Sequence, residues 1–224
     1  MDCLHNSDLS DSEYLGRFRR KAMENRIPLT GSIELTGQCN FRCVHCYLGD
    51  QGETPGTGHG ELATRQWFRI IDEIAGAGCL YLLITGGEPL LRADFLDIYL
   101  HAKRQGLVIT VFTNGTILTD EILSTWRQYP PRLVEITLYG STEKTYKEIT
   151  GRDKRLSVCL HNIDRLKASG IKVGLKTVLM NLNRHEFSEM EQIAADLNLP
   201  FRHDAAIFPR FNGDCTVTRL RIDP

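Results

Sequence analysis

The sequence has 224 residues, of which 42% are hydrophobic, so the chain is long enough to form one sizeable core. Its 27 basic and 28 acidic side chains nearly balance, which argues against a nucleic-acid partner and against an acidic solvating tail. No apolar run approaches the roughly 20 residues of a membrane span, and residues 1–11 are polar and acidic, unlike a signal peptide. We therefore expect a cytoplasmic protein without a membrane partner.

The first quarter of the chain predicts one helix, one strand and a long loop. Residues 1–29 carry mixed charge and scattered apolar positions, which favours a short peripheral helix that Pro28 ends. The short apolar run at residues 32–35 predicts the first strand. The loop after it contains three closely spaced cysteines and then a stretch rich in glycine, threonine and proline, residues 49–60, which we expect to be mobile.

Helices and strands then alternate. Helices are expected at residues 64–77, 93–104 and 119–127, over a longer region up to residue 169, and at residues 184–197; strands are expected at residues 80–85, 107–112, 133–138, 171–180 and 201–208. Gly78, Gly106 and Gly170 stand where helix C-caps are expected. Near-continuous apolar strands between such helices predict parallel βα units with both faces covered, in an open sheet or a full or partial barrel.

The polar motifs fall at the carboxyl ends of these strands, where parallel sheets place their ligand sites. Cys39, Cys43 and Cys46 follow the first strand and set three thiols within eight residues. Thiolates select iron-sulfur clusters, zinc or copper(I). A structural zinc site needs four ligands, and His45, which is adjacent to Cys46, is poorly placed to complete it. Three cysteines on a four-iron cluster would leave one iron free to bind a small molecule.

The spacing of these cysteines resembles the CxxxCxxC signature of the radical S-adenosylmethionine (SAM) superfamily. Three further segments resemble motifs of that superfamily: Gly86-Gly87-Glu88-Pro89 after the second strand, Thr113-Asn114-Gly115 after the third, and Thr137-Leu138-Tyr139-Gly140 after the fourth. The resemblance covers about residues 28–210. It implies a radical SAM core at residues 30–210, a peripheral segment at residues 1–29, and the start of a C-terminal extension or linker at residues 211–224.

The resemblance implies an α/β fold, a partial (β/α)6 TIM-like barrel with parallel strands, and an enzyme that uses a 4Fe-4S cluster and SAM. Cys39, Cys43 and Cys46 would hold the cluster, whose open iron chelates SAM. One electron would then cleave SAM to methionine and a 5′-deoxyadenosyl radical that abstracts hydrogen from substrate, so that the cofactors carry the chemistry and the protein supplies position and exclusion of water.

Six residues are expected to contact SAM. The resemblance assigns the SAM amino group to residues 86–89, the ribose or carboxylate to Thr137, and the adenine to His45 or its backbone; the full set is His45, Gly86, Gly87, Glu88, Pro89 and Thr137. The two glycines suit this role because a missing side chain lets backbone carbonyls approach the ammonium, and Pro89 stiffens the turn.

Other residues in these segments have more ordinary explanations. Asn114 either contacts the site or only ties a loop. Lys176 lies between apolar strand residues and either faces the interior or, as we favour, extends outward to solvent. The remaining cysteines are interpreted as buried hydrophobes at Cys79 and Cys159, a frayed terminus at Cys3, and an incidental thiol or a remnant cluster ligand at Cys215.

The residues flanking the motifs indicate which branch of the superfamily is most similar. Residues 33–36, the pair Cys46-Tyr47 and residues 208–210 resemble the peptide-modifying branch with a SPASM-type extension, whose substrates are ribosomally made peptides. Enzymes of haem and other cofactor biosynthesis have similar cores, and a zinc-binding module is an alternative of another class. The expected partners are a peptide or small-molecule substrate and a reductant such as flavodoxin or ferredoxin.

Overall fold

Six strands alternate with helices along the chain, as the sequence predicts. The structure, a computed structural model, describes residues 10–49 and 60–222. The strands are β1 (Thr30–Glu34), β2 (Tyr81–Thr85), β3 (Val108–Thr113), β4 (Leu133–Thr137), β5 (Val173–Val178) and β6 (Phe201–Asp204). The α-helices are α1 (Asp11–Glu24), α2 (Thr64–Gly76), α3 (Phe95–Arg104), α4 (Asp120–Gln128), α5 (Glu143–Thr150), α6 (Arg155–Ala168) and α7 (Phe187–Asp196).

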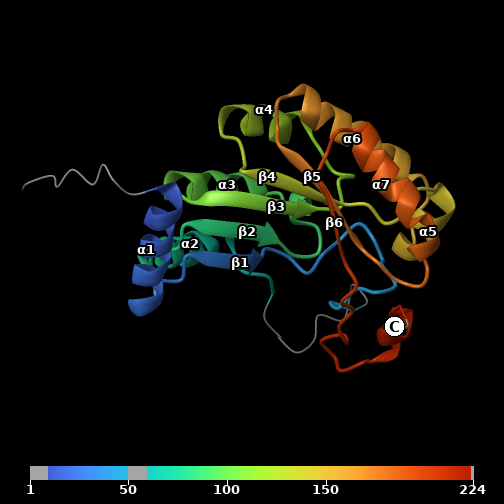
Figure 1. Cartoon of the computed structure of the whole chain (residues 1–224), viewed down its shortest axis with the longest axis horizontal. Helices are drawn as coiled ribbons and strands as arrows, with labels where there is room; N and C mark the ends of the chain where they lie inside the picture. The colour runs from blue at the N-terminus through green and yellow to red at the C-terminus, as the bar shows by residue number, and fades with distance from the viewer. Residues whose placement is uncertain (1–9, 50–59, 223–224) are drawn as a thin grey trace, which may run out of the picture.

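All six strands belong to one parallel sheet, and their order in the sheet is their order in the chain. Strands β1 and β6 form its two edges, so the sheet curves as part of a barrel without closing (Figure 1). Helix α1 lies near the amino ends of the strands, and the C-terminal segment lies near their carboxyl ends (Figure 1). The predicted partial (β/α)6 barrel is confirmed.

The hydrophobic core lies between the outer face of the sheet and the helices. Alternate strand residues point into it, among them Ile84, Ile109 and Ile136, all without exposed surface. Helices α3 and α4 contribute Tyr99 and Trp126, whose rings pack with a centroid distance of 6.2 Å. Because the apolar face of each helix covers the same side of the sheet, this core sets the spacing of the strand ends where the site forms.

The inner, concave face of the sheet is different, and the prediction that both faces are covered is wrong for it. Strand β3 alternates between buried and partly exposed residues, and on β2 Tyr81 is 40% exposed. Polar residues occupy this face, including Glu135 and Lys176. Lys176 does not extend outward to solvent, because its side chain is only 18% exposed and lies over the ring of Phe112. The concave face is therefore partly exposed on β2 and β3, buried on β4, and chemically mixed.

Several element boundaries also differ from the prediction. The long helical region before residue 169 is two helices, because Gly151 ends α5 in the left-handed conformation with φ of 67°. Strand β6 ends at Asp204 rather than residue 208, and helix α7 is preceded by a 3-10 turn, η2 (Arg184–Glu186). The predicted helix caps Gly78, Gly106 and Gly170 all have positive φ. Most of the loop expected to be mobile, residues 49–60, lies outside the described residues.

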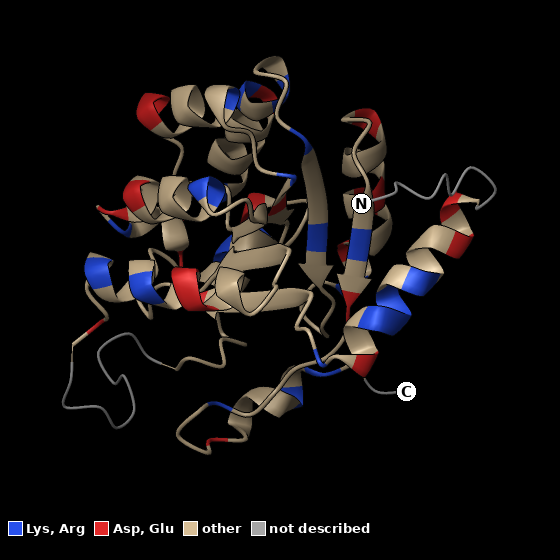
Figure 2. Ribbon diagram, turned by 90° about the vertical axis from the view of Figure 1, so that its left-hand side faces the viewer, with Lys and Arg blue, Asp and Glu red and all other residues tan. Residues whose placement is uncertain are grey.

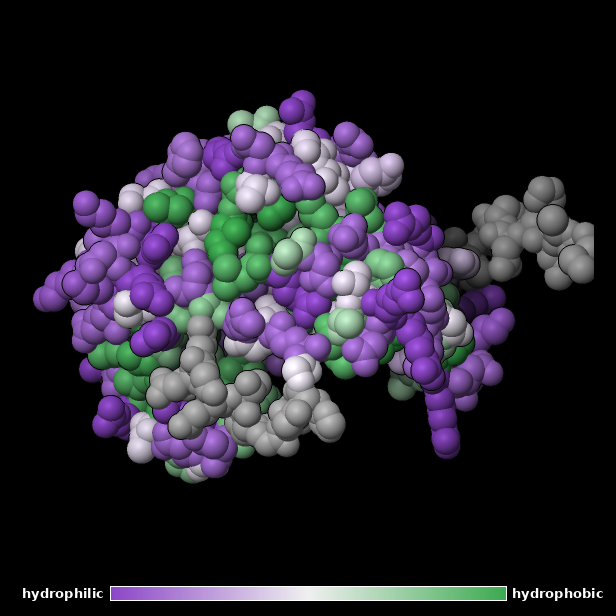
Figure 3. Space-filling model, turned by 180° about the vertical axis from the view of Figure 1, so that it is seen from behind, coloured by the Kyte–Doolittle hydropathy of each residue, from purple (hydrophilic) through white to green (hydrophobic). Residues whose placement is uncertain are grey.

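The C-terminal segment contains a short 3-10 helix that the sequence analysis did not predict, η3 (Thr216–Leu220). Its Val217 is buried in a second, smaller cluster with Ile149, Met180 and Ile207. The surface seen from behind is largely hydrophilic, with apolar patches between the polar side chains (Figure 3). No helix in the described part of the chain is long and apolar enough to cross a bilayer.

Shortening a side chain in the outer-face core should destabilise the fold. Ile109 has no exposed surface, so Ile109→Ala leaves a cavity in the central sheet and is expected to lower the free energy of unfolding by about 2–5 kcal/mol. Met23→Ala on α1, where the side chain is 80% exposed, should change it by less than about 0.5 kcal/mol. Urea denaturation followed by circular dichroism measures both, and equal midpoints for the two variants would contradict this account of the core.

Candidate metal centre and cofactor site

The cysteine loop after β1 is held by backbone hydrogen bonds to the end of helix α5. Arg42 N donates to Thr150 O and Val44 N donates to Ile149 O, each at 2.9 Å. Phe41, which is 1% exposed, packs its ring against those of Tyr139 and Tyr146. The loop therefore has a fixed shape although it contains no helix or strand of its own.

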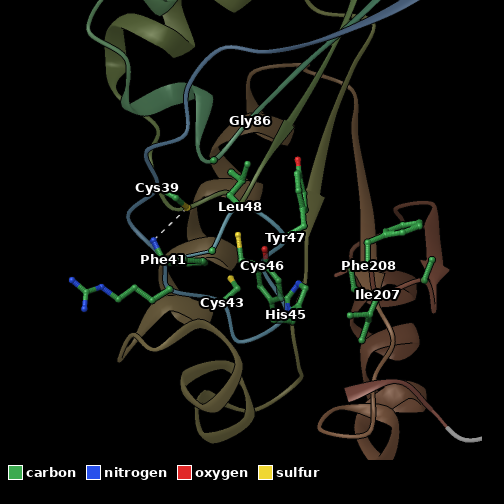
Figure 4. A pocket seen from close by; sticks show the side chains of 16 residues that line it. Cys39, Phe41, Cys43, His45, Cys46, Tyr47, Leu48, Gly86, Ile207 and Phe208 are labelled. Carbon is green, nitrogen blue, oxygen red and sulfur yellow. Dashed lines mark hydrogen bonds between the residues drawn. The ribbon is translucent and has the colours of Figure 1, made fainter. Parts of the chain in front are cut away.

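The structure brings the three predicted ligands to one cavity of about 280 Å³. Figure 4 shows the side chains of Cys39, Cys43 and Cys46 close together at this cavity, with His45 and Gly86 nearby. Of the residues predicted to bind the cluster or SAM, the cavity lining includes Cys39, Cys43, His45, Cys46, Gly86 and Gly87, and it does not include Glu88, Pro89 or Thr137. Ile207 and Phe208, which follow β6, close the opposite side.

The environment of the thiols keeps them protonated when no metal is present. Burial raises the pKa of Cys39 to about 11, and burial likewise raises the pKa of Cys43 and of Cys46. Thiolates bind metal, so the positive charge of bound iron must offset this desolvation. Arg210, in the segment after β6, acts in the same direction on Cys46 by lowering its pKa.

Two side chains outside the predicted set interact with the cysteine sulfurs. Asn114 Nδ2 lies 3.9 Å from Cys39 Sγ and 2.7 Å from Asn40 Oδ1, so this residue ties the end of β3 to the cysteine loop and also reaches the site. The hydroxyl of Tyr139, a partly buried residue, interacts with Cys43 and lowers the pKa of that thiol. Hydrogen bonds to ligand sulfurs tune iron-sulfur clusters. Sequence reasoning quoted Tyr139 within a motif but gave it no role.

The two glycines of residues 86–89 are required by close packing against the cysteine loop. A Cβ on Gly87 would lie 2.2 Å from Gln38 O, and a Cβ on Gly86 would lie 2.6 Å from Thr36 O. Gly86 also has a φ of 137°, a conformation that favours glycine. The loop backbone thus gives a reason for these glycines that the sequence analysis, which considered only the cofactor, did not include.

Glu88 and Pro89, the rest of this segment, support the site from outside the cavity. Glu88 is fully buried, and its carboxylate accepts hydrogen bonds from Thr113 Oγ1, Asn114 N and Leu90 N at 2.8–3.2 Å. Burial raises its pKa to about 7. Pro89 begins a 3-10 turn, η1 (Pro89–Leu91). The side chain of Glu88 therefore links β2 to β3, and its predicted contact with SAM, like that of Pro89, stays a prediction.

His45 and Thr137 are placed differently with respect to the cavity. His45 Nδ1 is buried and, within the described part of the chain, has no hydrogen-bond partner. Burial lowers the pKa of this ring to about 4, so it is neutral near pH 7. Thr137 ends β4 on the concave face and is 8% exposed. Contacts of either residue with SAM stay predictions.

The donor set fits an iron-sulfur cluster and a polar nucleotide. Three thiols share one cavity with the unpartnered Nδ1 of His45 and with the backbone of residues 86 and 87. Within residues 10–49 and 60–222, no three His, Cys, Asp or Glu side chains are arranged to hold one metal ion. Cys79 and Cys159 are buried, as expected, Cys215 is exposed, and Cys3 lies outside the described residues.

Comparisons with known proteins agree with the site. A family model described as the radical SAM superfamily matches residues 33–197. An AdoMet-dependent heme synthase of Methanosarcina barkeri is 30% identical over 181 residues, 81% of this chain and 51% of that protein. The mycofactocin maturase MftC of Mycobacterium ulcerans is 28% identical over 194 residues, 87% of this chain and 48% of that protein.

The fold is also shared with solved structures. Streptococcus suis SuiB bound to its precursor peptide SuiA superposes with a TM-score of 0.69 and 17% identity, over 91% of this chain and 46% of that one. This level of identity supports the shared fold alone. The chain spans about half the length of the curated relatives it matches.

A methyl group on Gly87 should displace the cysteine loop. Gly87→Ala is expected to lower the iron and sulfide bound per chain after anaerobic reconstitution, and to lower the free energy of unfolding by about 1–3 kcal/mol, because its Cβ would meet Gln38 O. Gly76→Ala is the matched control, since a Cβ at that helical position meets no atom within 4 Å. Iron content in Gly87→Ala equal to that of the unmodified chain would refute this role of the glycine.

Proposed function

This chain belongs to the radical SAM superfamily, and we propose that it uses a cluster on Cys39, Cys43 and Cys46 to modify a ribosomally made peptide. Members of the superfamily use a 4Fe-4S cluster and SAM, and the chain is an enzyme core of this kind. The observation that carries the proposal is the cavity in which the three thiols meet the backbone of residues 86 and 87.

A cluster held by Cys39, Cys43 and Cys46 would supply the electron for reductive cleavage of SAM to methionine and a 5′-deoxyadenosyl radical, which would take hydrogen from the substrate. The chain itself positions the cysteines through the hydrogen bonds of the loop to α5. Asn114 donates a hydrogen bond to the sulfur of Cys39, and Tyr139 lowers the pKa of Cys43, which favours the thiolate that binds metal. Phe41, Val178 and Ile207 supply apolar walls that exclude water from the cavity.

Three observations support a peptide substrate. The MftC relative is a maturase, and SuiB, whose fold this chain shares, was solved with a precursor peptide bound. The concave face of β3 is also partly exposed, so an extended substrate can contact it. We further propose that a small redox protein such as flavodoxin or ferredoxin supplies the electron.

A second candidate function is a step of haem or related cofactor biosynthesis. It is favoured by the 30% identity to the heme synthase of Methanosarcina barkeri. The two candidates differ in the source of the abstracted hydrogen. Deuterium transferred to 5′-deoxyadenosine from a deuterated peptide, or from a deuterated tetrapyrrole, distinguishes them by mass spectrometry.

Loss of one cysteine ligand should abolish SAM cleavage. We expect the anaerobically reconstituted chain to release 5′-deoxyadenosine and methionine on reduction with dithionite, and Cys43→Ala to reduce this release to background because two thiols do not hold the cluster. Cys215→Ala, which removes an exposed thiol outside the cavity, is the matched control and should retain release.

Liquid chromatography with mass spectrometry measures both products, and iron, sulfide and zinc are determined on the same samples. Stoichiometric zinc without sulfide would support a zinc-binding module instead. A chain that holds the cluster and SAM but releases no 5′-deoxyadenosine would refute the proposed reaction.

A further inference from the structure

The concave face of the sheet carries a cluster of side chains that the cofactor site does not use. It consists of Phe112 on β3, Glu135 on β4, Lys176 on β5 and Arg202 on β6, and we call it the concave-face cluster. Register pairs Phe112 with Glu135 and Lys176 with Arg202, so neighbouring strands present these side chains on one face. Figure 2 shows a basic residue within each of the adjacent strands β5 and β6.

The cluster lies next to the cysteine cavity. Val178 follows Lys176 by two residues on the same face of β5, and Val178 lines the cavity. Two residues of a strand advance about 6.6 Å. A substrate with its reacting carbon in the cavity therefore reaches the cluster by extending a short way along β5.

Glu135 is already neutralised by Arg202. Arg202 Nε donates to Glu135 Oε1 at 2.7 Å, and a second guanidinium nitrogen donates to Oε2. This two-point pairing fixes the carboxylate, which is 7% exposed, while the Arg202 side chain stays 52% exposed. The positive charge of Lys176 has no second carboxylate in the cluster to balance it.

The ammonium of Lys176 is held without good partners. Its Nζ lies 3.9 Å from Glu135 Oε2, beyond hydrogen-bond distance, and 3.0 Å from the centre of the Phe112 ring. Within the described part of the chain it makes no hydrogen bond, although an ammonium has three donors. Burial lowers its pKa to about 7, the charge of Arg202 acts in the same direction, and Glu135 opposes both.

We propose that Lys176 and Arg202 form a subsite that binds a carboxylate of the substrate, an inference that rests on the function proposed above. Glu135 is paired with Arg202, so the cluster offers no free carboxylate to the ammonium of Lys176. Asp204, a further charged group near Arg202, lies two residues along β6 and accepts a hydrogen bond from Ala206 N. A substrate carboxylate would give the ammonium the hydrogen-bond acceptor that it lacks.

Carboxylates occur both on acidic peptides and on tetrapyrroles, and binding measurements on the full chain loaded with cluster and SAM separate the two sources. One probe pair is a blocked peptide with a single glutamate and the same peptide with glutamine. The other pair is coproporphyrin III and its tetramethyl ester. The acid of one pair is expected to bind about 10-fold or more tightly than its uncharged counterpart, since charge-assisted hydrogen bonds are lost in the latter.

Variants of the cluster test which residues are responsible. Lys176→Met should weaken binding of the acid probe about 10-fold or more, and Glu135→Gln, which removes the competing carboxylate, should strengthen it. A gain of affinity does not arise from misfolding. Lys172→Met is the matched control, because Lys172 is an exposed lysine just before the same strand and should leave binding unchanged.

The pH dependence gives an independent readout. Affinity for the acid should fall between about pH 6 and about pH 8, because Lys176 loses its proton in this range while Arg202 keeps its charge. Lys176→Met should flatten this profile. Equal affinity for acid and uncharged probe, unchanged affinity in Lys176→Met, or no binding of either acid overturns the subsite.

Release of 5′-deoxyadenosine by the unmodified chain without any probe tests the proposed function separately. If that release is absent while the acid probe binds through Lys176, the proposed function fails and the anion subsite stands as a property of the concave face. If release occurs and the acid does not bind, the subsite alone fails.

Discussion

The site depends on the close approach of two backbone segments, residues 36–38 after β1 and residues 86–88 after β2. Gly87 N donates to Thr36 O at 2.7 Å and Glu88 N donates to Gln38 O at 2.8 Å, so the second segment positions the start of the cysteine loop. The buried carboxylate of Glu88 then connects this pair to the end of β3. Three neighbouring strand ends thereby act as one rigid support for the thiols.

The two faces of the sheet have separate tasks. The outer face is sealed by helices and provides the stability that fixes the strand ends. The concave face contributes little to the core and holds polar groups, among them Glu135, which Arg202 pairs at two points, and Lys176, which is only weakly paired. Keeping a weakly paired ammonium near Phe112 costs stability, and proteins commonly accept such a cost where a ligand is to be bound.

The sequence was sufficient to predict the fold and to single out the three cysteines that line one cavity, because both are local signals. The helix and strand periods follow from hydrophobic spacing, and Cys39, Cys43 and Cys46 lie within one loop. The sequence was insufficient where contacts between distant parts of the chain determine the role of a residue. Tyr139 reaches Cys43 across many residues, and the reason for Gly87 is an atom of Gln38 that only the folded chain brings near.

The position of Lys176 is a second feature that the sequence alone does not determine. A lysine between apolar strand residues is compatible with either face of a sheet, and only the register with Thr137 and Arg202 decides which one it occupies. The prediction that both faces are covered was likewise based on the apolar runs in the sequence. Along β2 and β3, however, buried residues alternate with more exposed ones, although the strands are nearly continuously apolar in composition.

The cavity walls come from distant parts of the chain, residues 39–49 on one side and residues 206–208 on the other. During translation the thiols therefore leave the ribosome long before the wall that faces them has been made. The cavity that would surround a cluster is therefore complete only after β6 has joined the sheet and residues 206–208 have folded over the cysteine loop.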